Sequence, residues 1–500
     1  MLSPAAKGAG GGWAAAILAL VVAVVYGNTF ANDWTYDDYF VIMANPAVRS
    51  LAGLLEKGLD WRCLRDLSLA IDHALWGSAP AGYHLQQLLL HWANAVLIFS
   101  FCVRHGCRWL PALGGSLFFI VHPLQVESVA NISHRKEALA LIFVLLLLHA
   151  YRSALRAAGT ARRGWLAAAL LAYGAALLAN ETAVTAIFLP LAYEALLLPP
   201  AERLLLRRPL VLALCGLLAG GLGVWYLQRH FPLAGQILKV FSKNGYYATP
   251  AYLPLLLGCL QVVALYAGKL LLPLKLAPEY VISFSASPWQ PLALAGLLIG
   301  AGLLVVIGLS RRRQPFLAFG LVAGLLLYLP IANLYPVAYM MADRYLYLPL
   351  AGLALALAAA CEALAPGRLS RLAMVVVLLA LALLSIRQNT VWRSEHSLWR
   401  HAVQVNPRSS AVQGAAARSY LRQGDLAQAL IHGSEAIRLD RQNVGAYLTL
   451  ARAEERTGNL PAAVGHYATF VALGAREFPR ETAEAAAYLP YLQRRLQRGE

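Results

Sequence analysis

The first apolar run of the chain ends in an acidic segment that reads Thr35-Tyr36-Asp37-Asp38-Tyr39-Phe40, with Asn45-Pro46 shortly after it. Two adjacent carboxylates at the point where a chain leaves a membrane fill no apolar core. Ionisable groups at a bilayer boundary are candidates for a functional site. A solvated turn or a helix N-cap would use the same residue types, so the segment alone leaves both interpretations open. The rest of the chain favours a site, because charged groups return repeatedly to the same predicted side of the membrane.

The composition indicates a membrane protein. Of the 500 residues, 59% are hydrophobic and only 13% are charged, which is about half the charged fraction of an ordinary soluble domain. The formal net charge is +17, but the basic residues form short clusters between apolar runs, as the positive-inside rule predicts. No basic patch with interleaved aromatic residues is visible, so no nucleic-acid partner is expected. The predicted fold class is all-α, with a polytopic membrane domain.

The cysteines suggest no special chemistry. The six form no CxxC pair and no set with metal-ligand spacing, and all but Cys63 lie in or beside apolar runs. We therefore expect neither a disulfide framework nor a thiolate metal site.

Apolar runs of about 20 residues predict helices that cross a bilayer. We predict eleven crossings and one ambiguous helix, or about 11–12 transmembrane helices. The first, at 13–26, is interpreted as a retained helix and not a cleaved signal peptide, because Lys7 is the only charge before it. The ambiguous run, 251–272, breaks the alternation of sides and suits an interfacial or re-entrant segment. The other runs are 84–103, 109–121, 136–151, 165–179, 183–198, 209–227, 291–309, 315–334, 346–363 and 372–386.

The arginine clusters between these runs predict the orientation. With the clusters on the cytoplasmic side, the N-terminus is cytoplasmic and the first outer loop is 31–83. The other segments expected outside are 122–135, 180–182, 229–250, 335–345 and the chain after about 387. Arg-rich, Lys-poor usage favours a bacterial inner membrane, with the C-terminal region in the periplasm.

The C-terminal part, 391–500, differs from the membrane domain, 1–390. Its short amphipathic segments repeat with a period of 34, since Gly424 matches Gly458 and Ala429 matches Ala463. Small residues at such offsets are typical of tetratricopeptide repeats, which stack into an α-solenoid with a concave binding surface. A generic helical hairpin bundle is the alternative.

Charged residues gather at the predicted outer ends of several apolar runs. The segment from His122 to Glu127 ends one crossing, and a helix over 126–136 would place Glu127, Asn131 and Arg135 on one face. A loop in which Glu127 and Arg135 pair weakly is the alternative. Glu181 ends another run, where it could also serve as a capping residue.

A third outer loop carries Asp343 and Arg344 among aromatic residues. The two could form a simple interfacial ion pair. The planar guanidinium of Arg344 also suits a phosphate group, to which it can donate two hydrogen bonds. Arg65 and His84 are weaker candidates.

Taken together, these segments resemble the transmembrane-and-tetratricopeptide-repeat O-mannosyltransferases and their bacterial relatives, within the GT-C glycosyltransferases. They cover nearly the whole chain in the expected order. The segments are Tyr36-Asp37-Asp38 with Asn45-Pro46; Leu67-Ser68-Leu69, Trp76-Gly77, Gly82-Tyr83-His84 and Leu88-Leu89-Leu90-His91; His122-Pro123 through Glu127; Arg135-Lys136; Glu181-Thr182-Ala183-Val184-Thr185; Asp343-Arg344-Tyr345-Leu346-Tyr347-Leu348-Pro349; and the repeats from Trp392.

This resemblance implies a GT-C fold, a polyprenyl-phosphate-linked sugar as donor and protein hydroxyls as acceptor, presented by the repeats. It implies that Asp37 or Asp38 is the catalytic base or orients the acceptor, that Glu127 supports that site, and that Arg344 holds the donor phosphate. Arg135 and Arg65 are further candidates for the phosphate, and His122, Glu181, His84 and Asp343 are candidates for supporting roles. The sequence departs from the family at Asp66, Gln87 and Asn180, and Asn180 removes an expected cation.

Glycosyl transfer needs a base for the acceptor hydroxyl and stabilisation of the departing phosphate. One carboxylate of the Asp pair can accept the proton while its neighbour raises that basicity by repulsion. Direct attack on the donor would invert the anomeric centre. A divalent cation at the pair is possible, but the spacing does not require one. The alternatives are a non-catalytic repeat scaffold for envelope or pilus assembly and a lipid-linked glycan ligase or flippase.

Overall fold

The computed structural model describes residues 4–58, 62–209, 252–282, 289–333, 339–364 and 367–499, with isolated positions between 213 and 221 and at 287. The predicted outer segment 229–250 and most of the predicted crossing 209–227 lie outside these residues. Within them the secondary structure is helical and contains no strand, so the all-α prediction is confirmed. Contacts divide the described residues into two units: the first holds those up to 276 and those from 287 to 393, and the second holds 277–282 and 394–499. Each unit is described by itself.

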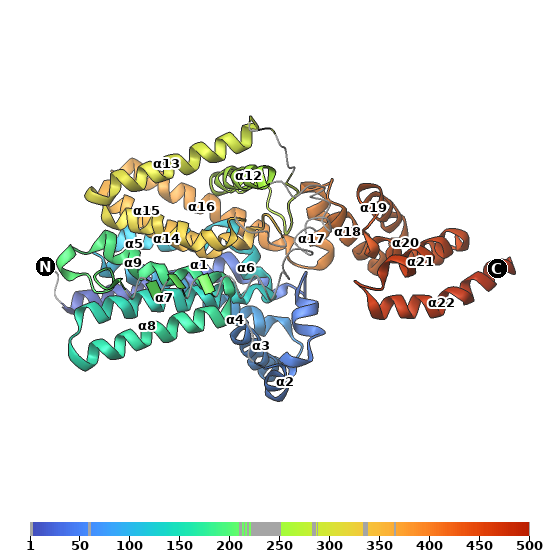
Figure 1. Cartoon of the computed structure of the whole chain (residues 1–500), viewed down its shortest axis with the longest axis horizontal. Coiled ribbons are helices and arrows are strands. Elements are labelled where there is room, and N and C mark those ends of the chain that lie inside the picture. Colours follow the sequence, from blue (N-terminus) through green and yellow to red (C-terminus); the bar gives the residue numbers. More distant parts are fainter. Residues whose placement is uncertain are drawn as a thin grey trace. The chain divides into compact units, whose positions relative to one another are not determined.

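The first unit is a bundle of α-helices with short 3₁₀ and π segments at their ends (Figure 1). Prolines mark several helix starts, since Pro80, Pro291 and Pro315 occupy the first turn of α4, α13 and α14, where a missing N–H costs nothing. Its α-helices are α1 (Pro4–Tyr26), α2 (Leu51–Lys57), α3 (Cys63–Trp76), α4 (Pro80–Arg104), α5 (Trp109–Val121), α6 (Val126–Ala130), α7 (Arg135–Arg156), α8 (Gly159–Ala179), α9 (Leu189–Leu197), α12 (Tyr252–Leu271), α13 (Pro291–Arg313), α14 (Pro315–Tyr328), α15 (Tyr347–Leu364) and α16 (Arg368–Val391). The short segments are η1 (Gly27–Ala31), η2 (Tyr39–Met43), η3 (Pro46–Arg49), η4 (Pro123–Gln125), η5 (Ile132–His134), η6 (Glu181–Phe188), η7 (Pro200–Glu202), η8 (Leu329–Ile331) and η9 (Asp343–Leu346).

Several helices of the first unit are long and apolar enough to cross a membrane. The described residues contain seven such helices, or up to eight if α5 and the segment Pro123–Ala130, bent by 52°, form one span. The predicted crossing 183–198 is divided between η6 and α9, and α8 carries Arg162 and Arg163 near its start. The ambiguous run 251–272 is a continuous helix, α12, that passes the same test. The chain is therefore a multi-pass membrane protein.

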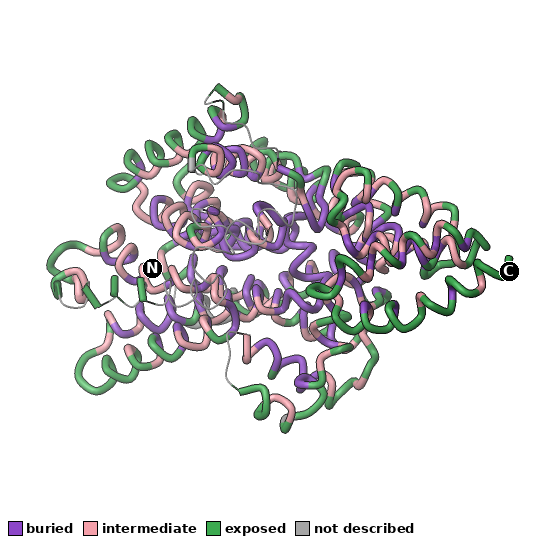
Figure 2. Tube along the Cα trace, turned by 45° about the vertical axis from the view of Figure 1, so that its right-hand side comes forward, coloured by how far each residue is buried: buried purple, intermediate pink, exposed green. Residues whose placement is uncertain are grey.

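The exposed surface of the first unit fits a lipid environment. Only 11% of the most apolar stretch of α13, and the same share of α16, is buried. The large hydrophobic residues exposed along both helices are leucines and valines, with one isoleucine. Figure 2 shows buried positions gathered on the inner sides of the bundle. Apolar side chains that point outward are stable in lipid, where helices satisfy their own backbone hydrogen bonds.

Glycines allow α14 and α15 to approach closely. A Cβ atom at Gly352 would lie 2.2 Å from the backbone nitrogen of Gly324 and 2.7 Å from the carbonyl oxygen of Gly320. Small residues at such crossings let helix backbones touch, which is a main source of helix association in membranes. Because η9 immediately precedes α15, this contact also fixes the backbone that carries Asp343 and Arg344.

Gly352→Ala is expected to destabilise the protein by about 1–3 kcal/mol, because the new methyl group overlaps the backbone of α14. Gly300→Ala in α13 is the matched control, since a Cβ there meets no atom within 4 Å. Thermal unfolding of the detergent-solubilised protein, followed by intrinsic fluorescence, measures both. Equal unfolding temperatures for the two variants would show that the α14–α15 contact is not tight.

The second unit is an array of helix pairs: α17 (Glu395–Val405), α18 (Ser410–Gln423), α19 (Leu426–Leu439), α20 (Val444–Thr457), α21 (Leu460–Gly474) and α22 (Pro479–Gln497). The helices α20 and α21 begin 34 residues after α18 and α19, which confirms the predicted period. Gly424 and Gly458 end the matching helices in the same left-handed conformation, with φ of 82° and 83°. Glycine adopts that conformation without steric cost.

Candidate functional site

The two adjacent aspartates lie in different environments. Tyr36 has a left-handed backbone with φ of 55°, which is uncommon for a residue with a side chain. Asp38 is fully buried, and its carboxylate accepts hydrogen bonds from the backbone N–H groups of Ser133 (2.7 Å) and Thr35 (3.2 Å). The Asp37 side chain is 51% exposed and lies 3.9 Å from Nε2 of His134. Asp37 is thus open to a ligand, and Asp38 is tied to the protein.

Burial raises the pKa of Asp38 to about 7, although the N–H groups of Ser133 and Thr35 act in the opposite direction. Transfer of a carboxylate out of water disfavours its charged form. Asp38 is therefore partly protonated near neutral pH.

The segment from Glu127 to Arg135 is not one helix, which corrects the prediction for 126–136. The helix α6 ends at Ala130, and Asn131 is extended, with φ of −99° and ψ of 120°. A hydrogen bond from Asn131 Nδ2 to the carbonyl oxygen of Thr35, 3.0 Å long, joins this break to the acidic segment. Glu127 and Arg135 have separate partners, so the alternative of a loop in which these two residues pair weakly is not found among the described contacts either.

Glu127 pairs with Arg344. Its carboxylate accepts hydrogen bonds from Nη1 of Arg344 at 2.5 Å and from the backbone N–H of the same residue at 2.9 Å. Both side chains are buried, at 2% and 6% exposure. Asp343, the residue directly before Arg344, is also buried.

Aromatic rings surround Arg344. Its guanidinium carbon lies 5.2 Å from the ring centres of Tyr339 and Tyr345 and 5.9 Å from that of Tyr36. These distances are within the range of cation–π attraction. Since Tyr36 directly precedes Asp37, the structure brings the acidic segment next to Arg344.

Arg135 and Arg65 are engaged inside the protein. Nη1 of Arg135 forms an ion pair with Asp72 at 2.5 Å, and its Nη2 donates to the carbonyl oxygen of Tyr83 at 2.9 Å. Arg65 pairs with Asp66 at 2.6 Å, and Asp66 also pairs with Lys57 at 2.5 Å. A buried guanidinium needs such a partner, and separating the two is costly. None of these contacts of Arg135 and Arg65 involves Arg344 or its partner Glu127.

Two further cations, which have no strong signal in the sequence, pair with carboxylates in this region. Arg62 binds Glu181 through Nη2 at 2.5 Å and Nε at 3.1 Å, and Lys136 lies 3.8 Å from Glu137. Arg62, Glu181 and Arg344 all act electrostatically on Lys136. The only sequence signal for Arg62 is a lone arginine before the amphipathic helix α3.

Arg62 strongly affects Glu181. Burial alone would raise the pKa of this carboxyl, but Arg62 and Lys136 lower it to about 2. Glu181 is therefore ionised at physiological pH. The resulting cluster of Arg62, Lys136, Glu181 and the pair Glu127–Arg344 is called the charged cluster below.

The two candidate histidines are buried. His122 accepts a hydrogen bond from the backbone N–H of Leu124 and lies 3.1 Å from the carbonyl oxygen of Leu270, which links η4 to α12. His84 is fully buried in α4. In the part of the chain that the structure describes, no group of three or more His, Cys, Asp or Glu residues is placed to hold a metal ion.

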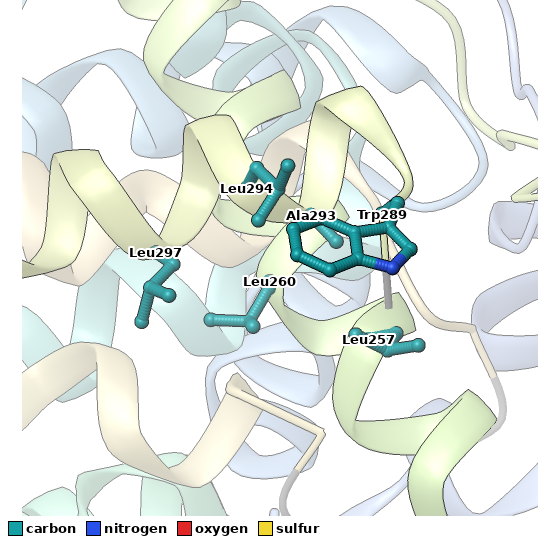
Figure 3. A pocket seen from close by; sticks show the side chains of 6 residues that line it. All are labelled: Leu257, Leu260, Trp289, Ala293, Leu294 and Leu297. Carbon is teal, nitrogen blue, oxygen red and sulfur yellow. The ribbon is translucent and has the colours of Figure 1, made fainter. Parts of the chain in front are cut away.

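A separate apolar pocket of about 300 Å³ lies between α12 and α13 (Figure 3). No residue of the charged cluster lines it. The lining residues are Leu257, Leu260, Trp289, Ala293, Leu294 and Leu297.

Comparisons with known proteins bear on this arrangement. No family model matches the chain. Protein O-mannosyl-transferase Tmtc3 of Drosophila melanogaster is 25% identical over 516 residues, which covers 86% of this chain and 55% of the fly protein. Protein O-mannosyl-transferase TMTC4 of Mus musculus is 23% identical over 504 residues, which covers 84% of this chain and 65% of the mouse protein. The chain is similar to protein O-mannosyl-transferases.

The resemblance predicted from the sequence is therefore confirmed. Protein O-mannosyl-transferase Tmtc1 of Drosophila melanogaster is 32% identical over a shorter stretch of 183 residues. This stretch covers 33% of this chain and 21% of the fly protein. The chain spans 55% and 65% of the length of Tmtc3 and TMTC4. Among solved structures, ArnT from Cupriavidus metallidurans bound to undecaprenyl phosphate matches with a TM-score of 0.41 and 16% identity, covering 91% of this chain and 80% of ArnT. This superposition is loose.

Proposed function

We propose that the chain is a membrane glycosyltransferase of the GT-C type. It would move a sugar, mannose or a similar hexose, from a polyprenyl-phosphate-linked donor to hydroxyl groups of an extracytoplasmic protein acceptor. The observation that carries the proposal is one open carboxylate, Asp37, in the acidic segment that contacts Arg344 at the start of a membrane-length helix. The similarity to protein O-mannosyl-transferases supports this choice of reaction.

Asp37 is the proposed base. Its carboxylate is exposed enough to meet an acceptor hydroxyl, and His134 lies beside it. In the reaction, the acceptor O–H bond breaks, its oxygen forms a bond to C1 of the sugar, and the bond from C1 to the phosphate oxygen breaks. A base that takes the hydroxyl proton accelerates such a step by about 10²–10⁴-fold. Attack from the side opposite the phosphate would invert the anomeric centre.

Asp38 and Glu127 are proposed as positioning residues. Asp38 holds Thr35 and Ser133 together, and Glu127 holds Arg344. Neither carboxylate has room to meet a substrate hydroxyl while these bonds exist. The two roles predicted for the Asp pair are thus divided between its members.

Arg344 is the proposed ligand of the donor phosphate, with Lys136 and Arg62 as additional cations. Positive charge placed where a phosphate leaves stabilises the transition state. Arg135 and Arg65 are proposed to support the fold through their ion pairs with Asp72 and Asp66. His122, His84, Asp343 and Glu181 are proposed to hold the backbone and the cations of the site in place. No step of this proposal requires a divalent metal.

The proposed setting is a bacterial inner membrane with the charged cluster on the periplasmic side. The lipid donor reaches the site from the bilayer, and the helical repeats of the second unit present the acceptor. The oligomeric state does not enter the proposal.

The test is sugar transfer by the purified full-length chain. A panel of short-chain polyprenyl-phosphate sugars is mixed with the protein and a serine- and threonine-rich peptide, and products are identified by mass spectrometry. Turnover of one donor supports the proposal and names the sugar. Binding or transbilayer movement of labelled lipid without any glycosylated product would favour a flippase, and no binding of any donor would favour a scaffold.

A further inference from the structure

The membrane-length helix α4 ends in a tight turn that carries two cysteines. Gly106 in this turn has a left-handed backbone, with φ of 91°. The backbone N–H of Cys107 donates a hydrogen bond to the carbonyl oxygen of Cys102 at 3.1 Å. The N–H of Gly106 donates to the carbonyl oxygen of Val103, also at 3.1 Å. These two bonds around a left-handed glycine form a Schellman motif, which ends many α-helices.

The turn brings the two cysteine side chains together. In a Schellman motif, the residue just past the turn packs against a residue in the last turn of the helix; here these residues are Cys107 and Cys102. Their side chains are buried, at 7% and 0% exposure, and both are free thiols. A hydrogen bond with the thiol of Cys102 lowers the pKa of Cys107 below its ordinary value.

The backbone geometry allows a disulfide between the two. A disulfide requires Cα atoms about 4.4–6.8 Å apart. The backbone hydrogen bond between Cys107 and Cys102 brings their Cα atoms into this range, because only short covalent bonds separate the Cα atoms from the bonded N and O. The spacing of the cysteines in the sequence predicts no such pairing, since it is the turn after the helix that closes the distance.

A third cysteine of this region, Cys361 of α15, has another partner. Cys107 acts electrostatically on Cys361, so the two are neighbours. The thiol of Cys361 contacts Sδ of Met374 in α16, at 3.7 Å. Cys102 is therefore the better placed partner for Cys107.

The turn also joins α4 to other helices. Arg108, directly after the two cysteines, donates to the carboxylate of Glu362 in α15 through its backbone N–H and its Nε, each at 2.7 Å. Nε2 of His105 lies 2.9 Å from the hydroxyl of Tyr193 in α9. A covalent bond across the turn would fix the backbone that makes both contacts.

We propose that Cys102 and Cys107 are a redox-responsive pair that forms a disulfide when a peroxide oxidises Cys107. The sulfur of Cys107 attacks a peroxide oxygen, the O–O bond breaks, and Cys107 becomes a sulfenic acid while water leaves. The sulfur of Cys102 then attacks the sulfur of Cys107, so that the S–S bond forms and the S–O bond breaks with loss of a second water. Overall, two thiols lose two hydrogen atoms and one hydrogen peroxide is reduced to two waters.

The surroundings explain why Cys107 reacts first. The thiolate is the nucleophilic form of cysteine, and Cys107 is the member of the pair that reaches the surface, between exposed Gly106 and Arg108. In the proposed orientation, this end of α4 faces the cytoplasm, where thiols are normally kept reduced. A disulfide there suits a reversible response to oxidation and not a permanent structural bond. The chemistry itself does not depend on the proposed sugar transfer.

The test is treatment of the full chain, in phosphatidylcholine nanodiscs, with hydrogen peroxide. Remaining thiols are then alkylated in denaturant, and peptides are identified by mass spectrometry. We expect a linked product of Cys102 and Cys107 that is lighter by two hydrogen atoms and carries no alkyl group, and alkylation of both after reduction with dithiothreitol. Cys361→Ala is the matched control and should leave this product unchanged. Cys102→Ala should leave Cys107 as a sulfenic acid, which dimedone traps.

A second measurement separates the effect of the fold from that of sequence spacing, because an unfolded chain can also join two nearby cysteines. The full chain is equilibrated with mixtures of reduced and oxidised dithiothreitol, either folded in nanodiscs or denatured in urea and detergent. The folded chain should keep the disulfide at about a tenfold higher ratio of reduced to oxidised reagent, since the turn raises the effective concentration of one thiol at the other. Equal ratios would overturn the proposal, as would a disulfide from Cys107 to Cys361 or peroxide treatment that leaves both thiols of the pair unlinked.

Discussion

Asp37→Asn is expected to abolish sugar transfer while leaving the protein as stable as the parent. The Asp37 side chain is half exposed, and its contact with His134 Nε2 at 3.9 Å is too long for a hydrogen bond that an amide would break. Loss of a general base lowers the rate by about 10²–10⁴-fold. Initial rates with a saturating donor, together with thermal unfolding temperatures, measure the two effects separately.

Asp38→Asn is the matched control and should behave in the opposite way. The N–H groups of Ser133 and Thr35 bind different oxygens of Asp38, so an amide keeps an acceptor for one of them and turns its NH₂ group toward the other. A buried donor left without its acceptor costs about 1–3 kcal/mol, so the unfolding temperature should fall. If Asp38→Asn were fully stable and inactive while Asp37→Asn remained active, the assignment of the two carboxylates would be reversed.

Arg344→Ala and Glu127→Ala are each expected to destabilise the protein by about 3–5 kcal/mol, because either one leaves a buried charge without its partner. Both side chains are almost fully buried and joined at 2.5 Å. The double variant Arg344→Met/Glu127→Leu should recover most of this stability, since well-packed apolar residues can replace a buried ion pair. Chemical denaturation of the three variants measures the coupling.

The same double variant tests the function. If Arg344 holds the donor phosphate, the stabilised double variant should still fail to bind or turn over the donor. Recovery of transfer together with stability would show that the pair is only structural. Lys136→Gln provides a comparison at the edge of the cluster, with a smaller expected loss of donor affinity.

The sequence was sufficient for features that depend on local pattern. The acidic segment was identified by its place after the first apolar run, and the helical array was identified by the spacing of Gly424 and Gly458, whose positive φ values only glycine adopts easily. Arg344 was identified because a lone cation among aromatic residues is unusual. Each of these signals lies within a few residues of chain or at one fixed period.

Features that depend on tertiary structure could not be predicted in this way. Glu127 and Arg344 are 217 residues apart, and nothing in either segment specifies the other. The sequence favours Arg135 as a phosphate ligand because it does not show that Asp72, 63 residues earlier, forms a buried ion pair with it. The extended conformation of Asn131 interrupts a segment whose spacing suits a helix, because its side chain bonds to Thr35. The division of the predicted crossing 183–198 between η6 and α9 was hidden for a similar reason, since hydrophobicity alone does not show where a helix breaks.

The pairing of Arg344 with Glu127 has a consequence for turnover. An arginine that already has a counter-ion binds phosphate by exchange, and the departing lipid phosphate leaves behind an ion pair and not a bare buried charge. Such an exchange lowers affinity for donor and spent carrier alike, because Glu127 competes with both. If Arg344 acts as proposed, the residence time of the spent carrier would be short, and the site would be cleared without trapping its own by-product.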